Sequence, residues 1–245
     1  MPGSTSPGAA GRGEDGALEP PWTEAPAGVV RKVIARRMLE SKLTIPHFYL
    51  FDQVDMEPAC AFRRELEAER GVKVSFTDLI VAAAARTLLE HPECNVSYRD
   101  GVLRRYRAVN INVAVAVEGG LLVPTVRDCG SLGLLELSGA IRELADRARN
   151  KKLRPRENQG GTFTVSNLGV FGLEGSFSII NPPQAMILTT GAVREAPVAR
   201  GGVLTAGTVM AVTLSCDHRA VDGAEGARFL MDFKRALGFP REFPL

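Results

Sequence analysis

The sequence predicts an α/β layer fold, in which helices pack on a largely antiparallel or mixed sheet. Two patterns alternate along the chain and carry this prediction. Apolar residues recur every three or four positions in some segments, as in helices, and every second position in others, as in strands. The composition agrees, because 45% of the 245 residues are hydrophobic and 24% are charged, which is enough to bury a full core.

The first half of the chain is predicted to form three helices and one strand. A helix begins near Val29 in VVRKVIARRMLESK, and IPHFYLFDQVDM then has strand character. Asp55 is expected to cap a short helix that Gly71 ends. Ser75 begins FTDLIVAAAARTLLE, which His91 ends. Because this helix is apolar on every face, we expect it to be buried.

The second half is predicted to be rich in strands. VNINVAVAVEGGLLVPTVRD alternates and indicates two strands around a Gly-Gly turn. GTFTVSNLG, AMILTTGAV and TVMAVTLSCDH are three further strand-like segments. Two amphipathic helices complete the order, and their expected buried positions are Leu134, Leu137, Ile141, Leu144 and Ala148 in one, and Leu230, Phe233 and Leu237 in the other.

The predicted boundaries are a flexible tail over residues 1–28, which are rich in Gly, Pro, Ala and Ser, and one domain over residues 29–245. A net charge of +2 and a pI near 8.4 are too mild to indicate a nucleic-acid partner. The N-terminus lacks the pattern of a signal peptide, and the longest apolar run, LIVAAAA, is too short to span a bilayer. We therefore expect a cytoplasmic protein without a membrane partner.

The four cysteines, Cys60, Cys94, Cys129 and Cys216, lie far apart and form no C-x-x-C pair. This spacing indicates neither a zinc site nor a disulfide framework, and we expect no metal. Cys216 lies two positions before His218, so the two could supply a thiolate nucleophile or a pair of metal ligands. A third ligand or orienting partner is missing at useful spacing, which favours Cys216 as a small apolar core residue.

Of the three histidines, His218 is the candidate functional residue. It follows an apolar strand in SCDHRAVDGAEG and has Asp217, Arg219 and Asp222 close by, so charge and backbone can fix its tautomer. His47 and His91 are expected to be capping or packing residues without a catalytic function.

A second polar cluster lies in GTFTVSNLGVFG. In an extended strand Thr162, Thr164 and Ser166 share one face, and the chain turns directly afterwards, so Ser166 lies at the strand end. From this stretch alone, a hydroxyl that caps the turn is favoured over a functional one.

Six segments in the same order give the chain, from about Val29 to its end, a resemblance to a known family. They are RKVIARRMLESKLTIPHFYL, VSFTDLIVAAAARTLLEHPECN, INVAVAVEGGLLVPTVRD, GGTFTVSNLGVFG, IINPPQAMILTTGAV and SCDHRAVDGAEGARFL. The chain resembles the catalytic domain of the dihydrolipoamide acyltransferase component of 2-oxo acid dehydrogenase complexes. The resemblance implies a chloramphenicol acetyltransferase-like sandwich, with a mixed sheet and packed helices, that forms trimers.

The resemblance also implies roles for particular residues. The family signature His-x-x-x-Asp-Gly falls on His218, Asp222 and Gly223, and its histidine is the general base that takes a proton from a thiol. The hydroxyl that stabilises the tetrahedral oxyanion matches Ser166. Asp222 is expected to order the histidine loop through an ion pair, with an arginine of RKVIARR as its partner. In the family the histidine and the hydroxyl come from neighbouring subunits.

The implied activity is acyl transfer between a dihydrolipoyl thiol and coenzyme A, and SNLGVFG and IINPPQA favour an acetyl group. No lipoyl domain or partner-binding domain is recognised, so the lipoyl group is expected from a lipoyl domain of another chain. The expected partners are a homotrimer or larger core, with 2-oxo acid dehydrogenase and dihydrolipoamide dehydrogenase components. The alternatives are a non-catalytic trimeric scaffold, or a coenzyme A acyltransferase with another acceptor.

Overall fold

A computed structural model of the chain describes residues 22–118 and 120–245. The chain divides into two compact units, residues 1–36 and residues 37–245. In the first unit, residues 22–28 are exposed and have no regular secondary structure, and α1 (Val29–Thr44) begins after them as predicted. The tail prediction over residues 1–28 falls mainly outside the described residues. The larger unit holds all the other elements.

A mixed seven-stranded sheet forms the centre of the larger unit. Its strands are β1 (His47–Asp55), β4 (Ile111–Val113), β7 (Thr125–Val126), β8 (Phe163–Asn167), β9 (Met186–Thr190), β10 (Arg194–Arg200) and β11 (Val203–Asp217). They lie in the order β1-β11-β9-β8-β4-β7, and β10 pairs with the first part of β11. β4 and β9 run parallel to β8, whereas the other neighbours are antiparallel. The predicted mixed sheet is confirmed.

Two small hairpins stand apart from this sheet, and they are β2 (Val96–Arg99) with β3 (Val102–Arg105) and β5 (Val115–Val117) with β6 (Gly120–Leu122). The predicted antiparallel arrangement around the Gly-Gly turn is confirmed, because β5 pairs with β6 and β4 pairs with β7, but each of the two predicted strands is divided into two short ones. At Ala114 the backbone N–H donates to Val165 O, and beyond it Val115 packs with Ala145 and Ala148 instead of continuing in the main sheet. Gly119 of the predicted turn lies outside the described residues.

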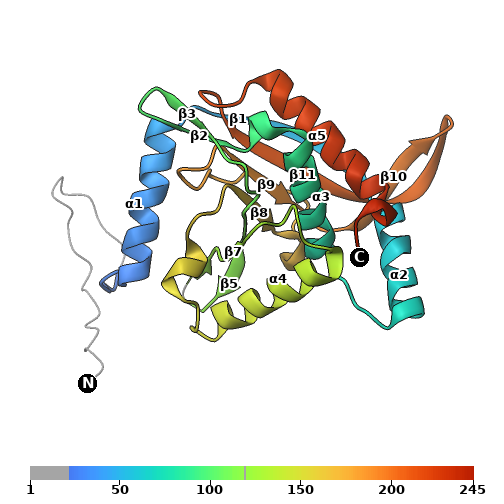
Figure 1. The fold of residues 1–245 in the computed structure, drawn as a ribbon, viewed down its shortest axis with the longest axis horizontal. Helices are drawn as coiled ribbons and strands as arrows, with labels where there is room; N and C mark the ends of the chain where they lie inside the picture. The colour runs from blue at the N-terminus through green and yellow to red at the C-terminus, as the bar shows by residue number, and fades with distance from the viewer. Residues whose placement is uncertain (1–21, 119) are drawn as a thin grey trace. The chain divides into compact units, whose positions relative to one another are not determined.

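The helices of the larger unit cover the sheet, and they are α2 (Glu57–Arg70), α3 (Phe76–Glu90), α4 (Leu134–Arg149) and α5 (Gly223–Gly238). α3 packs between α4 and α5 (Figure 1). Ser75 caps α3 with a capping box, and Gly71 ends α2 in the left-handed conformation, both as predicted. The N-cap of α2 is Met56, although Asp55 Oδ1 accepts from the N–H of Glu57 at 3.0 Å.

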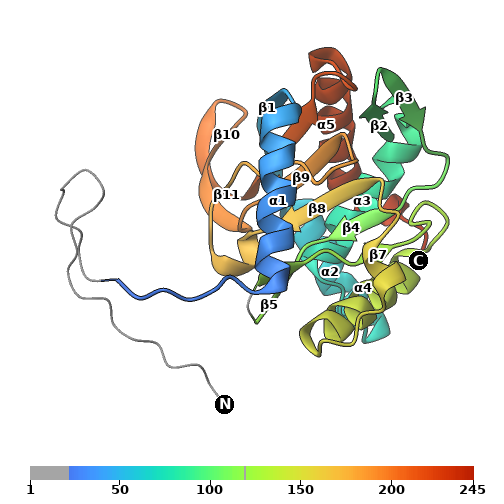
Figure 2. The same cartoon turned by 90° about the vertical axis from the view of Figure 1, so that its left-hand side faces the viewer.

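The strands β8, β9 and β11 have two different faces. One face is apolar and packs into the main core, where Phe163 of β8 meets Phe229 of α5 with ring centroids 5.6 Å apart. α3 lies beside β8 on this side, as Figure 2 shows. The other face carries buried hydroxyls, which belong to Thr164, Ser166, Thr189, Thr213 and Ser215. The alternation of strand residues therefore places Ser166 on the polar face, away from the core.

Candidate active site

Ser166 lies near the end of β8 and lines a cavity of about 650 Å³. It is buried, and its hydroxyl makes no hydrogen bond within the described residues. The turn after β8 is capped by its neighbour instead: Asn167 Oδ1 accepts from the N–H of Gly169 at 2.9 Å, and Asn167 Nδ2 donates to Thr77 Oγ1 at 3.0 Å. The turn-capping interpretation of Ser166 was therefore wrong, and its hydroxyl is free to meet a ligand.

Cationic side chains gather in the lining of the same cavity, and they are Arg63, Lys73, Arg142 and Arg149. Arg63 is fixed in place, because its Nε donates to Val74 O at 2.6 Å and its guanidinium lies 4.1 Å from the ring centroid of Phe76. Asp78, the carboxylate among the described lining residues, is buried and accepts hydrogen bonds from Ser75 N and from Ser138 Oγ. The lining thus carries net positive charge, which suits an anionic ligand, although Lys73 and Arg149 also pair with Glu67 and Asp146.

His218 occupies the turn that follows β11 and is exposed in the single chain. Its backbone N–H donates to Pro46 O at 3.1 Å, and its ring lies 4.7 Å from the ring of Phe48, centroid to centroid. The strand ends at Asp217, and His218 is the first residue of the turn after it. The backbone of His218 is fixed by its hydrogen bond and the ring packs against Phe48, while the side chain is otherwise exposed. A general base requires such a fixed but accessible imidazole.

Asp222 is the N-cap of α5. Its Oδ1 accepts from the N–H of Glu225 at 2.8 Å, and Glu225 Oε2 accepts from the N–H of Asp222 at 2.9 Å. This capping box fixes the end of the loop that carries His218. The ion pair with an arginine of RKVIARR stays a prediction.

Strand register shows how far apart Ser166 and His218 lie. Ser166 pairs with Thr189 of β9, and Thr189 pairs with Thr213 of β11, so these three residues form one row across the sheet. His218 follows Thr213 along the chain at the far end of β11. At about 3.3 Å per residue, His218 lies roughly 16 Å along β11 from the row that contains Ser166. The two strand spacings between β8 and β11 add a separation of roughly 10 Å across the sheet. One chain therefore does not bring the two side chains together.

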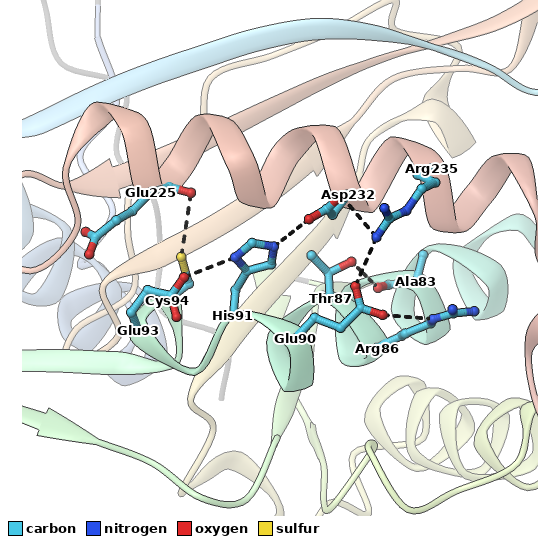
Figure 3. A network of polar contacts seen from close by, with 10 residues as sticks. All are labelled: Ala83, Arg86, Thr87, Glu90, His91, Glu93, Cys94, Glu225, Asp232 and Arg235. Atoms are coloured by element: carbon cyan, nitrogen blue, oxygen red, sulfur yellow. Dashed lines mark hydrogen bonds and ion pairs between the residues drawn. The ribbon is translucent and has the colours of Figure 1, made fainter.

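The other histidines have structural roles, as predicted. His47 Nδ1 lies 2.8 Å from Ile45 O, and its Nε2 accepts from the N–H of Ile180 at 3.1 Å. His91 is the C-cap of α3 and lies between two carboxylates, with Nε2 2.7 Å from Asp232 Oδ2 and Nδ1 3.1 Å from Glu93 Oε1 (Figure 3). His91 thereby links the end of α3 to α5.

The alternative chemistry at Cys216 has no support in the structure. Cys216 is fully buried in the main core, and burial raises the pKa of its thiol above its ordinary value. A thiol in this environment stays protonated and is a poor nucleophile. Residues 22–118 and 120–245 contain no group of His, Cys, Asp and Glu side chains that could hold a metal ion, and no helix among them is long and apolar enough to cross a membrane.

Sequence reasoning did not find the cations of the cavity. Arg142 and Arg149 lie two helical turns apart on the polar face of α4, a spacing that places both on the same side of the helix. That pattern was a possible signal, but Arg63 and Lys73 come from a different part of the chain. Only the packing of α2, α3 and α4 brings the four together.

The fold is a chloramphenicol acetyltransferase-like α/β fold, since the chain superposes on chloramphenicol acetyltransferase over 82% of its length with a TM-score of 0.52 at 15% identity. The more specific match is to a family model. Residues 19–245 match the model of the 2-oxoacid dehydrogenases acyltransferase (catalytic domain). The chain belongs to this family.

Two relatives are similar over most of this chain. The dihydrolipoyllysine-residue acetyltransferase component of the pyruvate dehydrogenase complex of Rickettsia bellii is 41% identical over 88% of this chain and 53% of its own length. The chain thus spans about half the length of the curated relatives it matches. The structure of Azotobacter vinelandii dihydrolipoamide acetyltransferase, from a study of a serine, a histidine and an asparagine in its catalytic mechanism, is 34% identical, with a TM-score of 0.85 over 89% of this chain and 92% of that chain.

Proposed function

We propose that the chain catalyses transfer of an acetyl group between a dihydrolipoyl thiol and coenzyme A, with His218 as general base. The observation that carries the proposal is the free hydroxyl of Ser166 in a cationic cavity. Spacing supports it, because the serine, histidine and asparagine of the Azotobacter enzyme are separated by the same intervals as Ser166, His218 and Asp222. Aspartate replaces asparagine here, and both residue types are good N-caps.

In the proposed reaction, the neutral imidazole of His218 accepts the proton of the coenzyme A thiol. A free thiol has a pKa of about 8.5, so an adjacent base raises the thiolate fraction at neutral pH. The sulfur attacks the thioester carbonyl carbon, and the resulting oxyanion accepts a hydrogen bond from Ser166, a contact worth roughly 3 kcal/mol in comparable sites. The bond to the dihydrolipoyl sulfur then breaks, and His218 returns the proton to that sulfur.

The proposed site is formed by two chains. Because the sheet separates Ser166 from His218 within one chain, the histidine of one subunit has to approach the cavity of its neighbour. A cyclic trimer supplies such head-to-tail interfaces, and each of its three interfaces would hold one complete site.

Coenzyme A fits the cationic cavity on chemical grounds. Its phosphate groups match Arg63, Lys73, Arg142 and Arg149, and its thiol arm would extend toward Ser166. The dihydrolipoyl group, carried on a lipoyl domain, would enter from the other side of the interface. We expect Arg142→Ala to raise KM for coenzyme A several-fold and to leave KM for dihydrolipoamide unchanged, whereas Arg104→Ala on the exposed β3 hairpin changes neither.

The test is thioester formation on free dihydrolipoamide from acetyl-, succinyl- and isobutyryl-coenzyme A. Wild type is compared with His218→Ala, and with His91→Gln as a histidine control outside the site, after the assembly state of each is checked. We expect turnover of acetyl-coenzyme A that falls by 10² to 10⁴-fold in His218→Ala only. Turnover of a different donor would correct the acyl group. No turnover by an assembled wild type would favour the scaffold or another acceptor.

A further inference from the structure

The two residues that flank His218 are bonded to each other. Arg219 Nε lies 2.9 Å from Asp217 Oδ1, and Arg219 Nη2 lies 2.8 Å from Asp217 Oδ2, which is a two-pronged guanidinium-carboxylate contact. The backbone N–H of Arg219 also donates to Asp217 Oδ1 at 3.0 Å. These bonds join the residues on both sides of His218, so the histidine lies at the tip of a short turn that the Asp217–Arg219 pair holds closed.

The carboxylate at the base of this turn is buried, and its backbone is fixed as well. The side chain of Asp217 is only 3% exposed, against 31% for Arg219. Its backbone N–H donates to Ala185 O at 2.8 Å, and its carbonyl oxygen accepts from the N–H groups of Ala220 and Val221 at 2.9 and 3.0 Å. A buried carboxylate depends on its partner, so loss of Arg219 would leave an unpaired charge directly beside His218.

The outer side of Arg219 is held by an aromatic ring. Its guanidinium carbon lies 4.7 Å from the ring centroid of Tyr98 on β2, a cation–π contact. β2 is itself attached to the sheet region, because Val96 O accepts from the N–H of Ala185 at 3.2 Å. Ala185 therefore contacts both β2 and Asp217, and the guanidinium is fixed between two elements of the scaffold.

We propose that Asp217, Arg219 and Tyr98 form a clamp that positions His218 for proton transfer. The inference rests on the proposed function, since it gives these residues a role only through His218. The clamp, together with the His218 N–H bond to Pro46 O and the contact with Phe48, leaves the imidazole few ways to move. It also keeps the Asp217 carboxylate occupied, so that this carboxylate does not compete for the imidazole.

The kinetic test compares variants in assembled protein. Arg219→Lys keeps the charge and removes the two-pronged contact, and we expect kcat to fall by about 10 to 100-fold while KM for both substrates changes less than about twofold. Tyr98→Leu is expected to lower kcat. Tyr98→Phe is expected to keep kcat near the wild-type value, because phenylalanine keeps the aromatic face. Arg200→Lys is the control, since Arg200 also pairs with two carboxylates but lies beside the opposite end of β11.

Two further measurements separate positioning from a general loss of stability. In a His218→Ala background, Arg219→Lys should cause no additional loss of the residual rate, because the clamp acts through the histidine. Amide hydrogen exchange of residues 217–222 should accelerate in Arg219→Lys and stay unchanged in Arg200→Lys. An unchanged exchange rate, or an unchanged kcat beside an inactive His218→Ala, would overturn the clamp. Absence of turnover in wild type would instead refute the proposed function and, with it, the catalytic role of the clamp.

Discussion

Ser166 on β8 and His218 in the turn after β11 lie roughly 16 Å apart along the strands and roughly 10 Å apart across them. Ser166 shares a row with Thr189 and Thr213, and His218 comes after the last residue of β11. Proton transfer and oxyanion stabilisation both need heavy atoms about 3 Å apart, which these side chains do not reach within one chain. The geometry makes catalysis by the proposed route a property of the interface between chains.

Mixed assemblies test this directly. Ser166→Ala and His218→Ala are each expected to be inactive alone, with kcat lower by at least about 10²-fold. When the two variants are unfolded together at equal amounts and reassembled, about a quarter of the interfaces in a cyclic trimer combine an intact serine with an intact histidine. We therefore expect about a quarter of the wild-type activity to return.

The same experiment has an internal control. Reassembly of each variant with itself should restore the oligomer but not the rate. If the mixture also stayed inactive while forming oligomers of the same size, then the serine and the histidine would have to act from the same chain, and the interface model would be wrong.

Asp222 offers a second prediction, because its observed contact is the N-cap of α5. Asp222→Ala removes the acceptor for the N–H of Glu225 and should lower the free energy of unfolding by about 1 kcal/mol. Asp222→Asn should keep this stability, since asparagine caps equally well. Thermal unfolding of the three proteins checks the order. If Asp222→Asn were as unstable as Asp222→Ala, the charge of Asp222 would matter more than its cap.

Local signals explain why much of the fold was predictable from the sequence. Ser75 and Gly71 mark helix ends through their own backbone and side-chain chemistry, and the apolar positions of α4 form one buried face. Such features depend on residues close together in the chain. The burial of α3 over residues 78–85 followed from its apolar composition, although Leu89 and Glu90 at its end are exposed.

The parts that were not predicted depend on distant pairing. β10 contains Pro197, exposes most of its residues and forms only because β11 extends beyond the other strands to pair with it. β3 is exposed along its whole length and lacks the alternation of a half-buried strand. His218 and Ser166 could be singled out by their local sequence. Their place on neighbouring subunits was implied only by the family resemblance, and the cationic cavity was not predicted. The separation depends on the register of β8, β9 and β11, and the cavity depends on helix packing.

A third prediction concerns Cys216, which lies two residues before His218. Burial raises the pKa of the thiol, so we expect no reaction with iodoacetamide in the folded protein. Cys216→Ala should retain wild-type kcat within about twofold and lose about 1 kcal/mol of stability from the small cavity. Mass spectrometry after alkylation and steady-state kinetics check the two parts. A loss of kcat comparable to that of His218→Ala would contradict this prediction and support the hypothesis that the Cys216 thiolate is a nucleophile.

The last prediction is a pH dependence of stability that arises at His91. Burial alone lowers the pKa of this imidazole, but hydrogen bonds with Asp232 and Glu93 outweigh it, so the folded-state pKa is raised above 6.5. Arg228 and Arg235 also act on these carboxylates, and neither reverses that direction. A raised pKa means that the folded chain binds the proton more tightly than the unfolded chain.

The sign of the effect follows from this. The stabilisation by protonated His91 is fully present below about pH 6.5, the unfolded value, and is lost as the pH rises through the folded-state pKa. We expect the difference in unfolding free energy between wild type and His91→Gln to shrink as the pH is raised over a range that starts near 6.5, measured by urea unfolding at fixed protein concentration. Asp232→Asn should move this decline to lower pH, because it removes the contact of 2.7 Å. A difference that stays constant across the range would show that His91 joins α3 to α5 without changing its protonation.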